Sequence, residues 1–175
     1  MQICKPVIAT LVLAGLLVGC GEDPEKERFR QELIDKALND ETRQAGTAFM
    51  AQNRERESVS VTASGLQIEH LRKGEGASPD PRDTVVVHYE GTRVDGGVFD
   101  SSYAREKPAT FPLNQVIRGW REGLTLMQEG GEAMLYLPPE LAYGATSPSP
   151  DIPANSTLIF RVELLEVIKT QEGAQ

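Results

Sequence analysis

Few side chains in this sequence have the types and spacing that conventional catalysis requires. His70 and His88 are the two imidazoles, and both lie on the polar side of strand-like stretches, so a metal site is not expected. The sequence contains no Gly-x-Ser-x-Gly elbow, no P-loop and no Gly-x-Gly-x-x-Gly motif after a strand. Among its 26 acidic residues, no spacing singles out a pair for acid-base catalysis. An activity that depends on a metal, a cofactor or a nucleophile is therefore not predicted.

One stretch, residues 85–120, is instead rich in aromatic and branched side chains. It holds half of the ten aromatic residues of the chain, among them Tyr89, Phe99, Phe111 and Trp120. It opens with a strand pattern in which Val85, Val87 and Tyr89 alternate with polar residues. A hairpin turn follows at residues 95–97, where two glycines permit positive φ. So much apolar surface outside a regular element favours a concave apolar binding site.

The elements around this stretch predict an antiparallel α+β domain. Alternating apolar residues predict strands at residues 66–71, 133–137 and 158–164. We expect a short helix at residues 121–127, with Gly130-Gly131 as its stop signal. Residues 138–156 form a proline-rich loop, and loops of this length in compact domains are usually functional or disordered. Strands joined by hairpins and long loops, with one helix, indicate the α+β class.

Residues 1–19 have the pattern of a signal peptide. Lys5 precedes an apolar run at residues 7–18, which is shorter than the about 20 residues that span a bilayer. The run ends in Leu17-Val18-Gly19-Cys20, which resembles the lipobox of bacterial lipoproteins. That resemblance implies a lipidated Cys20 and a membrane-anchored lipoprotein that faces the periplasm. Gly21 is not the aspartate that retains enteric lipoproteins in the inner membrane, which favours the outer membrane. An ordinary secretory signal with an incidental cysteine is the alternative.

Charge and cysteine content limit the partners further. The net charge is −8, or −9 without residues 1–19, whose single charged residue is Lys5. An acidic chain without a basic stripe argues against nucleic acid as a partner. Because Cys4 leaves with the signal peptide and Cys20 carries lipid, no disulfide and no free thiol are expected.

Residues 20–57 are charged and helix-favouring. Asp23-Pro24 fits a helix cap followed by a first-turn proline. Apolar residues then recur at helical spacing, as Phe29, Leu33, Ala37 and as Ile34, Leu38, Ala45, Phe49. Asp40 can cap a second helix, in which Gly46 costs about 1 kcal/mol. The segment is either a spacer that lifts the domain off the membrane or a homodimerisation segment at residues 25–55, and the sequence leaves both open. The composition of residues 58–63 predicts a linker.

Several ordered motifs resemble those of the FKBP-type peptidyl-prolyl isomerases. They are Val87-His88-Tyr89-Glu90-Gly91, Gly97-Val98-Phe99-Asp100-Ser101-Ser102, Val116-Ile117-Arg118-Gly119-Trp120, Ala142-Tyr143-Gly144 and Leu158-Ile159-Phe160-Arg161-Val162-Glu163-Leu164. The resemblance places a domain at residues 64–169, followed by a disordered tail at 170–175. Residues 49–67 further resemble the macrophage infectivity potentiator group, whose members carry helices ahead of the domain.

The resemblance implies a fold and a site. The fold is a curved five-stranded antiparallel sheet wrapped around one short helix, preceded by an N-terminal helical segment. The implied catalytic residues are Tyr89, Phe99, Asp100 and Tyr143, and the implied substrate-binding residues are Arg105, Phe111, Val116, Ile117, Trp120, Ile152 and Phe160. Trp120 is the floor, and the Ile117 N–H and Tyr143 hydroxyl bond to ligand carbonyls. Ala109 replaces a phenylalanine that many members have at the rim, and Pro148 replaces a histidine that some have on the flap, which leaves the substrate preference open.

The implied activity is isomerisation of X-Pro bonds in exported proteins, without a cofactor, in support of folding in the periplasm. Macrolide immunosuppressants are the implied inhibitors. Two alternatives stay open: a chaperone or binding module of the same fold that captures proline segments without turnover, and a structural lipoprotein whose helices do the work. The sequence does not identify the client proteins or the residue preferred before proline.

Overall fold

The computed structural model describes residues 25–26, 28–30, 33 and 40–170 of the chain. The predicted signal peptide and Cys20 lie outside these ranges, as do residues 171–175 of the predicted tail. Thr170, the first residue of that tail, is fixed by a hydrogen bond from its N–H to Asp83 at 2.9 Å and from its hydroxyl to the Arg82 carbonyl at 2.6 Å. None of the helices in the described ranges has the length and apolar character needed to cross a bilayer.

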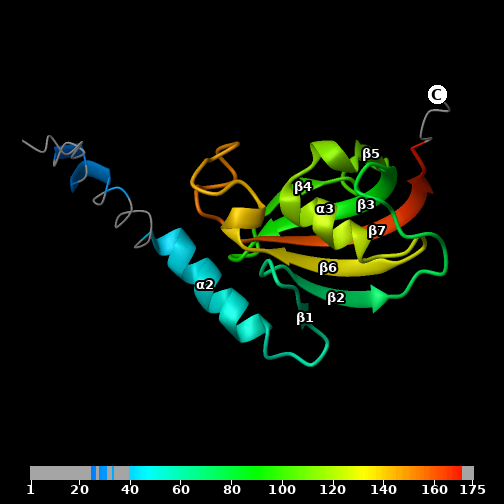
Figure 1. Ribbon diagram of the computed structural model, residues 1–175, viewed down its shortest axis with the longest axis horizontal. Coiled ribbons are helices and arrows are strands. Elements are labelled where there is room, and N and C mark those ends of the chain that lie inside the picture. The colour runs from blue at the N-terminus through cyan, green and yellow to red at the C-terminus, as the bar shows by residue number, and fades with distance from the viewer. Residues whose placement is uncertain (1–24, 27, 31–32, 34–39, 171–175) are drawn as a thin grey trace, which may run out of the picture.

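The described chain forms an antiparallel sheet against which helix α3 (Arg118–Thr125) packs, with helix α2 (Glu41–Asn53) at one end (Figure 1). The strands are β1 (Ser60–Val61), β2 (Gln67–Arg72), β3 (Thr84–Arg93), β4 (Val98–Ser101), β5 (Ala109–Pro112), β6 (Glu132–Leu137) and β7 (Leu158–Ile168). Two short 3-10 helices are η1 (Leu113–Gln115) and η2 (Pro139–Leu141). The order across the sheet is β1-β2-β6-β7-β3-β4, and β5 also pairs with β3. The predicted α+β fold is confirmed.

The sheet has seven strands in the described residues, whereas the resemblance implied five. Two features account for the difference. β4 and β5 share one edge of β3, since β4 pairs with Glu90–Thr92 and β5 with Thr84–Val87. The other is β1, which has only two residues and pairs with β2. β1 lies in residues 58–63, so the stretch predicted as a linker contributes to the sheet.

β3 is the central strand of the site, and its burial follows the predicted alternation. Val85 and Val87 are fully buried and Tyr89 is nearly so, while the residues between them are half-buried. β3 pairs with β7 along its whole length. The predicted hairpin is also present: Gly96 has a φ of 84° and the Arg93 N–H donates to the Gly97 carbonyl at 2.9 Å.

Helix α3 begins and ends earlier than predicted, at Arg118–Thr125 rather than at residues 121–127. Gly119 lies in its first turn, where sequence propensity disfavours glycine. Packing explains the residue, because a Cβ at position 119 would overlap the Leu137 side chain of β6. A second glycine, Gly123, faces Leu135 in the same way. The two glycines allow α3 to lie close against the sheet, and the helix ends at Thr125, before Gly130.

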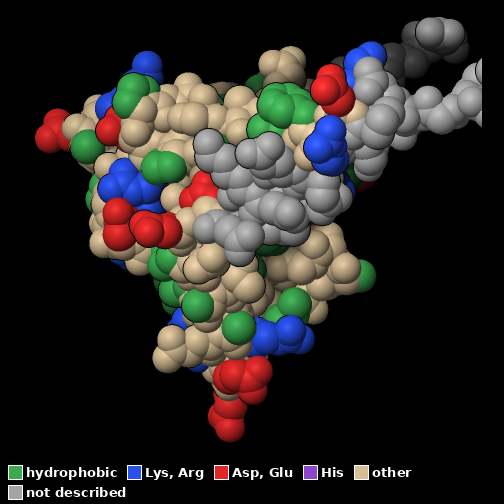
Figure 2. Space-filling view, turned by 90° about the vertical axis from the view of Figure 1, so that its left-hand side faces the viewer, with side chains coloured by type: hydrophobic (Ala, Val, Ile, Leu, Met, Phe, Trp, Pro, Cys, Tyr) green, Lys and Arg blue, Asp and Glu red, His purple; other side chains and the backbone are tan. Residues whose placement is uncertain are grey.

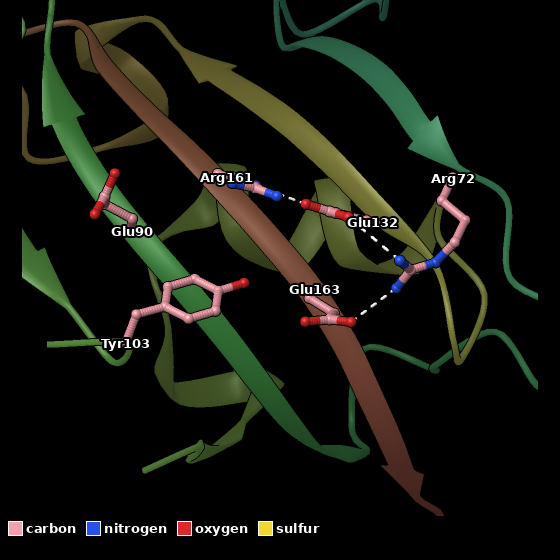
Figure 3. A pocket seen from close by; sticks show the side chains of 6 residues that line it. All are labelled: Arg72, Glu90, Tyr103, Glu132, Arg161 and Glu163. Atoms are coloured by element: carbon pink, nitrogen blue, oxygen red, sulfur yellow. Dashed lines mark hydrogen bonds and ion pairs between the residues drawn. The ribbon is translucent and has the colours of Figure 1, made fainter. Parts of the chain in front are cut away.

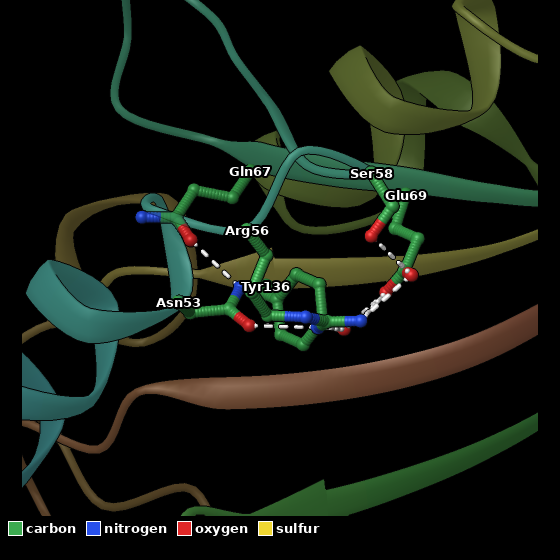
Figure 4. A network of polar contacts seen from close by, with 6 residues as sticks. All are labelled: Asn53, Arg56, Ser58, Gln67, Glu69 and Tyr136. Atoms are coloured by element: carbon green, nitrogen blue, oxygen red, sulfur yellow. Dashed lines mark hydrogen bonds and ion pairs between the residues drawn. The ribbon is translucent and has the colours of Figure 1, made fainter.

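Helix α2 is docked on the domain. Asp40 caps it as predicted, since its carboxylate accepts a hydrogen bond from the Thr42 N–H at 2.8 Å. Figure 4 shows the polar contacts at its other end. They are Asn53 to Gln67 at 2.8 Å, Arg56 to Glu69 at 2.7 Å, Arg56 to Tyr136 at 3.0 Å, Ser58 to Glu69 at 2.7 Å and Tyr136 to Glu69 at 2.9 Å. Phe49 packs near Tyr136, with ring centroids 5.9 Å apart. These contacts hold α2 against β2 and β6.

Candidate functional site

A hollow of about 320 Å³ opens where β3, β4, β5, η1, α3 and the loop before β7 meet. Its walls bring together residues that are up to 71 positions apart in the sequence. They are Tyr89, Phe99, Asp100, Phe111, Gln115, Val116, Ile117, Trp120, Tyr143 and Phe160. All but Gln115 are among the residues that the resemblance implied. The structure therefore assembles nine of the eleven predicted site residues around one cavity.

Trp120 forms the base of the aromatic cluster. Its ring lies at nearly right angles to three others, with centroids 5.1 Å from Tyr89, 5.4 Å from Phe111 and 5.2 Å from Phe160. Phe99 meets Phe160 edge to face at 5.5 Å. Edge-to-face contacts of this kind add about 0.5–1.5 kcal/mol each beyond area burial. The rings hold one another in place, so the cavity has rigid apolar walls.

Gly91 on β3 makes this ring arrangement sterically feasible. A Cβ at that position would lie 2.5 Å from the Phe99 ring and 2.9 Å from the Phe160 ring. A side chain there would therefore push the two rings apart. Gly91 belongs to a motif that carried the family resemblance, but its role depends on rings from β4 and β7 and follows only from the fold.

The polar side of the hollow is a linked set of three residues. The Tyr89 hydroxyl and the Arg105 guanidinium both donate to the Asp100 carboxylate. Arg105 also donates to the Tyr89 hydroxyl at 2.9 Å, and its guanidinium carbon lies 5.6 Å from the Tyr89 ring centre. Burial alone would raise the pKa of Asp100, but the hydrogen bonds from Tyr89 and Arg105 outweigh it and lower that pKa. Burial and the Asp100 carboxylate raise the pKa of Tyr89.

These directions fix the protonation states near neutral pH. Asp100 is a carboxylate that is satisfied by its two partners, and Tyr89 is a neutral phenol. Tyr89, Asp100 and Arg105 use these groups to bond to one another. The rest of the lining is mainly aromatic and aliphatic.

Backbone and rim groups complete the site. Ile117 is the N-cap residue of α3 and has no side-chain cap bond. The first N–H groups of a helix have no intrahelical acceptor, so this corner of the hollow can donate to a carbonyl. Tyr143 lies at the rim, with 40% of its surface exposed. Ala109, on β5, and the exposed Pro148 do not line the hollow.

Two predicted site residues are not in the cavity wall. Arg105 lies behind Asp100, which it contacts, and Ile152 is buried in the core at 6% exposure. Gln115 lines the hollow and was not predicted. It lies in the short 3-10 helix between β5 and α3. The one sequence feature that could have indicated Gln115 is its position directly before the motif that begins with Val116 and Ile117.

A second hollow lies on the sheet surface and is strongly charged (Figure 3). Four of its five ionic side chains pair with one another: Arg161 with Glu132 at 2.6 Å, Arg72 with Glu163 at 2.7 Å and Arg72 with Glu132 at 3.5 Å. Within the described ranges no group of three or more His, Cys, Asp or Glu is arranged to hold a metal ion. This surface is a network of ion pairs across the strands and offers no apolar site.

On the molecular face shown in Figure 2, acidic and basic side chains lie next to one another and hydrophobic side chains form small separate groups. That face therefore presents no extended field of one sign. The aromatic hollow, by contrast, has a lining that suits a specific apolar ligand.

Comparison with known proteins identifies the family that this chain matches. Residues 75–165 match the family described as FKBP-type peptidyl-prolyl cis-trans isomerase, and residues 22–69 match the domain amino-terminal to it. The chain is 44% identical over 146 residues to a probable FKBP-type peptidyl-prolyl cis-trans isomerase FkpA of Neisseria meningitidis, covering 80% of this chain and 54% of that protein. It is 44% identical over 148 residues to the outer membrane protein MIP of Legionella longbeachae, covering 81% of this chain and 64% of that protein.

Among solved structures, FkpA from Escherichia coli superposes with a TM-score of 0.72 and 39% identity, covering 83% of this chain and 68% of that chain. The chain spans only 54% and 64% of the length of the two relatives named above. The matched region nevertheless includes every residue of the aromatic hollow. The fold, the hollow and these matches together place the chain in the FKBP-type peptidyl-prolyl cis-trans isomerase family.

Proposed function

We propose that this protein is a peptidyl-prolyl cis-trans isomerase that accelerates rotation about X-Pro bonds in exported proteins. The observation that carries the proposal is the aromatic hollow built around Trp120, at whose edge Tyr89, Asp100 and Arg105 are hydrogen-bonded to one another. The proposed catalytic residues are Tyr89, Phe99, Asp100 and Tyr143. The other wall residues, together with Arg105 behind Asp100 and Ile152 in the core, bind or support the substrate.

The chemistry of the reaction suits such a site. Rotation about an X-Pro bond must break amide resonance, against a barrier of about 18–20 kcal/mol. The twisted amide has lost that resonance, so its carbonyl is less polar than in the planar ground state. An apolar cavity that holds the proline ring therefore stabilises the twisted form more than the planar form. A 10⁴-fold acceleration needs only about 5.5 kcal/mol of such stabilisation. No nucleophile, metal or cofactor is required.

A short Leu-Pro or Phe-Pro peptide tests the proposal directly. The purified protein should accelerate cis-to-trans exchange, which takes about 10–100 s without a catalyst. A macrolide of the immunosuppressant class should abolish the acceleration by filling the hollow. If the folded protein at micromolar concentration leaves the rate unchanged, the isomerase proposal fails. Macrolide binding without acceleration would instead favour a proline-binding module.

We also propose that the protein is a lipoprotein held on a membrane by Cys20 and facing the periplasm, with the outer membrane as its address. The lipobox-like residues 17–20 support the anchor, and Gly21 supports the outer membrane. A relative named an outer membrane protein is consistent with that address. The proposed organisation is a signal peptide at residues 1–19, a lipidated helical segment at 20–57, a connection at 58–63, the isomerase domain at 64–169 and a tail at 170–175.

For the helical segment we propose dimerisation through residues upstream of Asp40. Helix α2 uses one face for contacts with its own domain, at Gly46, Phe49 and Asn53. Phe29 and Leu33 are one helical turn apart and are 63% and 50% exposed, which supports an apolar contact between two copies. The other role, a spacer between membrane and domain, follows if the protein proves monomeric.

A further inference from the structure

Helix α2 contacts both ends of the loop that carries Tyr143. On the N-terminal side of Tyr143, Glu140 in η2 forms an ion pair with Arg43 of α2. On the C-terminal side, the Asn155 side chain donates to the carboxylate of Asp40, the cap of α2, at 3.3 Å. Residues three apart in a helix lie on one face. The same face of α2 therefore touches the loop where it leaves the sheet and where it returns.

The loop backbone transmits these contacts to the neighbour of Tyr143. The Gly144 N–H donates to the Pro139 carbonyl at 2.8 Å, and the Asn155 N–H donates to the Gly144 carbonyl at 2.7 Å. Gly144 is thus bonded to both ends of the loop. Asn155 makes its contacts from a left-handed conformation with a φ of 61°, which asparagine tolerates better than most residues. The position of Tyr143 follows from the positions of Pro139 and Asn155.

A third contact sets how closely α2 lies. A Cβ at Gly46 would overlap the hydroxyl of Thr157, which is 2% exposed. Asp40, Arg43 and Gly46 are spaced by three residues and form one contact surface. α2 therefore lies against the loop from its cap to its second turn, at a distance that only glycine permits.

We propose that α2 is a positioning element for substrate binding, which holds Tyr143 over the aromatic hollow through Arg43–Glu140 and Asp40–Asn155. This inference rests on the proposed isomerase function and assigns a part in it to residues outside the isomerase domain. A rim loop that is already ordered binds its ligand without losing further conformational freedom. Loss of the Arg43–Glu140 or Asp40–Asn155 contact therefore weakens substrate binding. The turnover of bound substrate depends on the walls around Trp120 and changes less.

A charge exchange tests the Arg43–Glu140 contact. Arg43→Glu and Glu140→Arg each place like charges together, and each should raise KM about twofold to fivefold, the scale of an exposed ion pair. kcat should stay within about twofold, because the walls of the hollow are untouched. The double variant R43E/E140R should return KM to the parent value. Arg54→Glu, at the other end of α2, is the matched control and should leave KM unchanged.

Asn155→Gly tests the second contact. Glycine keeps the left-handed backbone and the N–H bond to Gly144 but removes the amide that reaches Asp40. It should raise KM on the same scale as the single charge variants. A general loss of stability would affect the whole protein, whereas Asn155→Gly should change only KM and the order of the loop.

Amide hydrogen exchange supplies a readout that does not depend on catalysis. The N–H groups of Gly144 and Asn155 should exchange faster in the single variants, and at the parent rate in R43E/E140R and in Arg54→Glu. The proposal is overturned if exchange and KM are unchanged in the single variants, or if the double variant restores neither. If the parent protein has no isomerase activity, the function proposed above fails, and the exchange rates still decide whether α2 positions the loop.

Discussion

Asp100 accepts hydrogen bonds from Tyr89 and Arg105 at the edge of an apolar hollow, so a single substitution there disrupts three side chains at once. Phe99 has a different role, because its ring meets Phe160 and closes the wall above Gly91. His88 faces the other side of β3, where it stacks on Tyr103 with ring centroids 4.7 Å apart. The three residues therefore lie on three different surfaces. Phe99 belongs to the apolar wall, Asp100 to the polar edge of the hollow, and His88 to the outer face of the sheet.

Asp100→Leu and Phe99→Ala should each lower kcat/KM for a Leu-Pro peptide by about tenfold or more, equivalent to about 1.4 kcal/mol of transition-state stabilisation. The physical reason is the loss of an oriented Tyr89 in the first variant and of an aromatic wall in the second. His88→Ala should change kcat/KM less than twofold. Equal effects in all three variants, with folding verified by circular dichroism, would contradict the site.

The pH dependence of the rate should be flat from about pH 5 to about pH 9, because neither titrating group of the polar edge changes charge there. The lowered pKa of Asp100 keeps it ionised down to acidic pH, and the raised pKa of Tyr89 keeps it protonated in alkali. The stability contributed by the Asp100 carboxylate is present above its unfolded pKa and is lost as the pH falls through its lower folded pKa. Peptide exchange rates across a buffer series measure this, and a bell-shaped optimum near neutrality would argue for acid-base catalysis.

Among the elements, α3 has the greatest influence on the site, since it carries Trp120 and ends the hollow at Ile117. Gly119→Ala should destabilise the protein by about 1–3 kcal/mol, even though alanine is the better helix former by about 1 kcal/mol. The added methyl would overlap Leu137 and force α3 away from β6, which moves the neighbouring Trp120. Urea unfolding measures the change. Arg118→Ala, at an exposed position of the same helix, is the control and should lie within about 0.5 kcal/mol of the parent.

The elements differ in how well the sequence predicts them, for physical reasons. β3 and its hairpin could be predicted because alternating burial and a glycine turn are local properties. The start of α3 was misplaced because Gly119 is chosen for its contact with β6, which lies later in the chain. Gln115 and Gly91 were missed as contributors for the same reason. Nine of the residues that the family resemblance implied line the hollow, whereas Arg105 contacts Asp100 and Tyr89 and Ile152 is buried in the core. This distinction depends on tertiary packing.

At the scale of the whole molecule, the proposed anchor and the proposed role of the helical segment can each be tested on the full chain. Cys20→Ser should release the protein from membranes in soluble form, because it removes the cysteine on which we propose the lipid anchor. Fractionation of cells that express the variant measures this. Retention of Cys20→Ser with the membrane would show that another part of the chain holds it there.

Light scattering of the soluble Cys20→Ser protein should give the mass of a dimer, and Phe29→Glu with Leu33→Glu should reduce it to a monomer. Charges at these two exposed positions would disrupt an apolar contact between copies without touching α2 or the domain. Arg28→Glu, on the same segment, is the control for added negative charge. If the Cys20→Ser protein without these substitutions has the mass of a monomer, the dimer proposal fails and the helical segment is a spacer.

Trp120 is the single tryptophan of the sequence, and it lies at the base of the hollow with 4% of its surface exposed. Its indole N–H has no hydrogen-bond partner in the described structure. The tryptophan fluorescence of the protein therefore comes from one indole, in contact with three aromatic rings at the proposed substrate site. A titration with a proline peptide or a macrolide can be followed by this emission without any label.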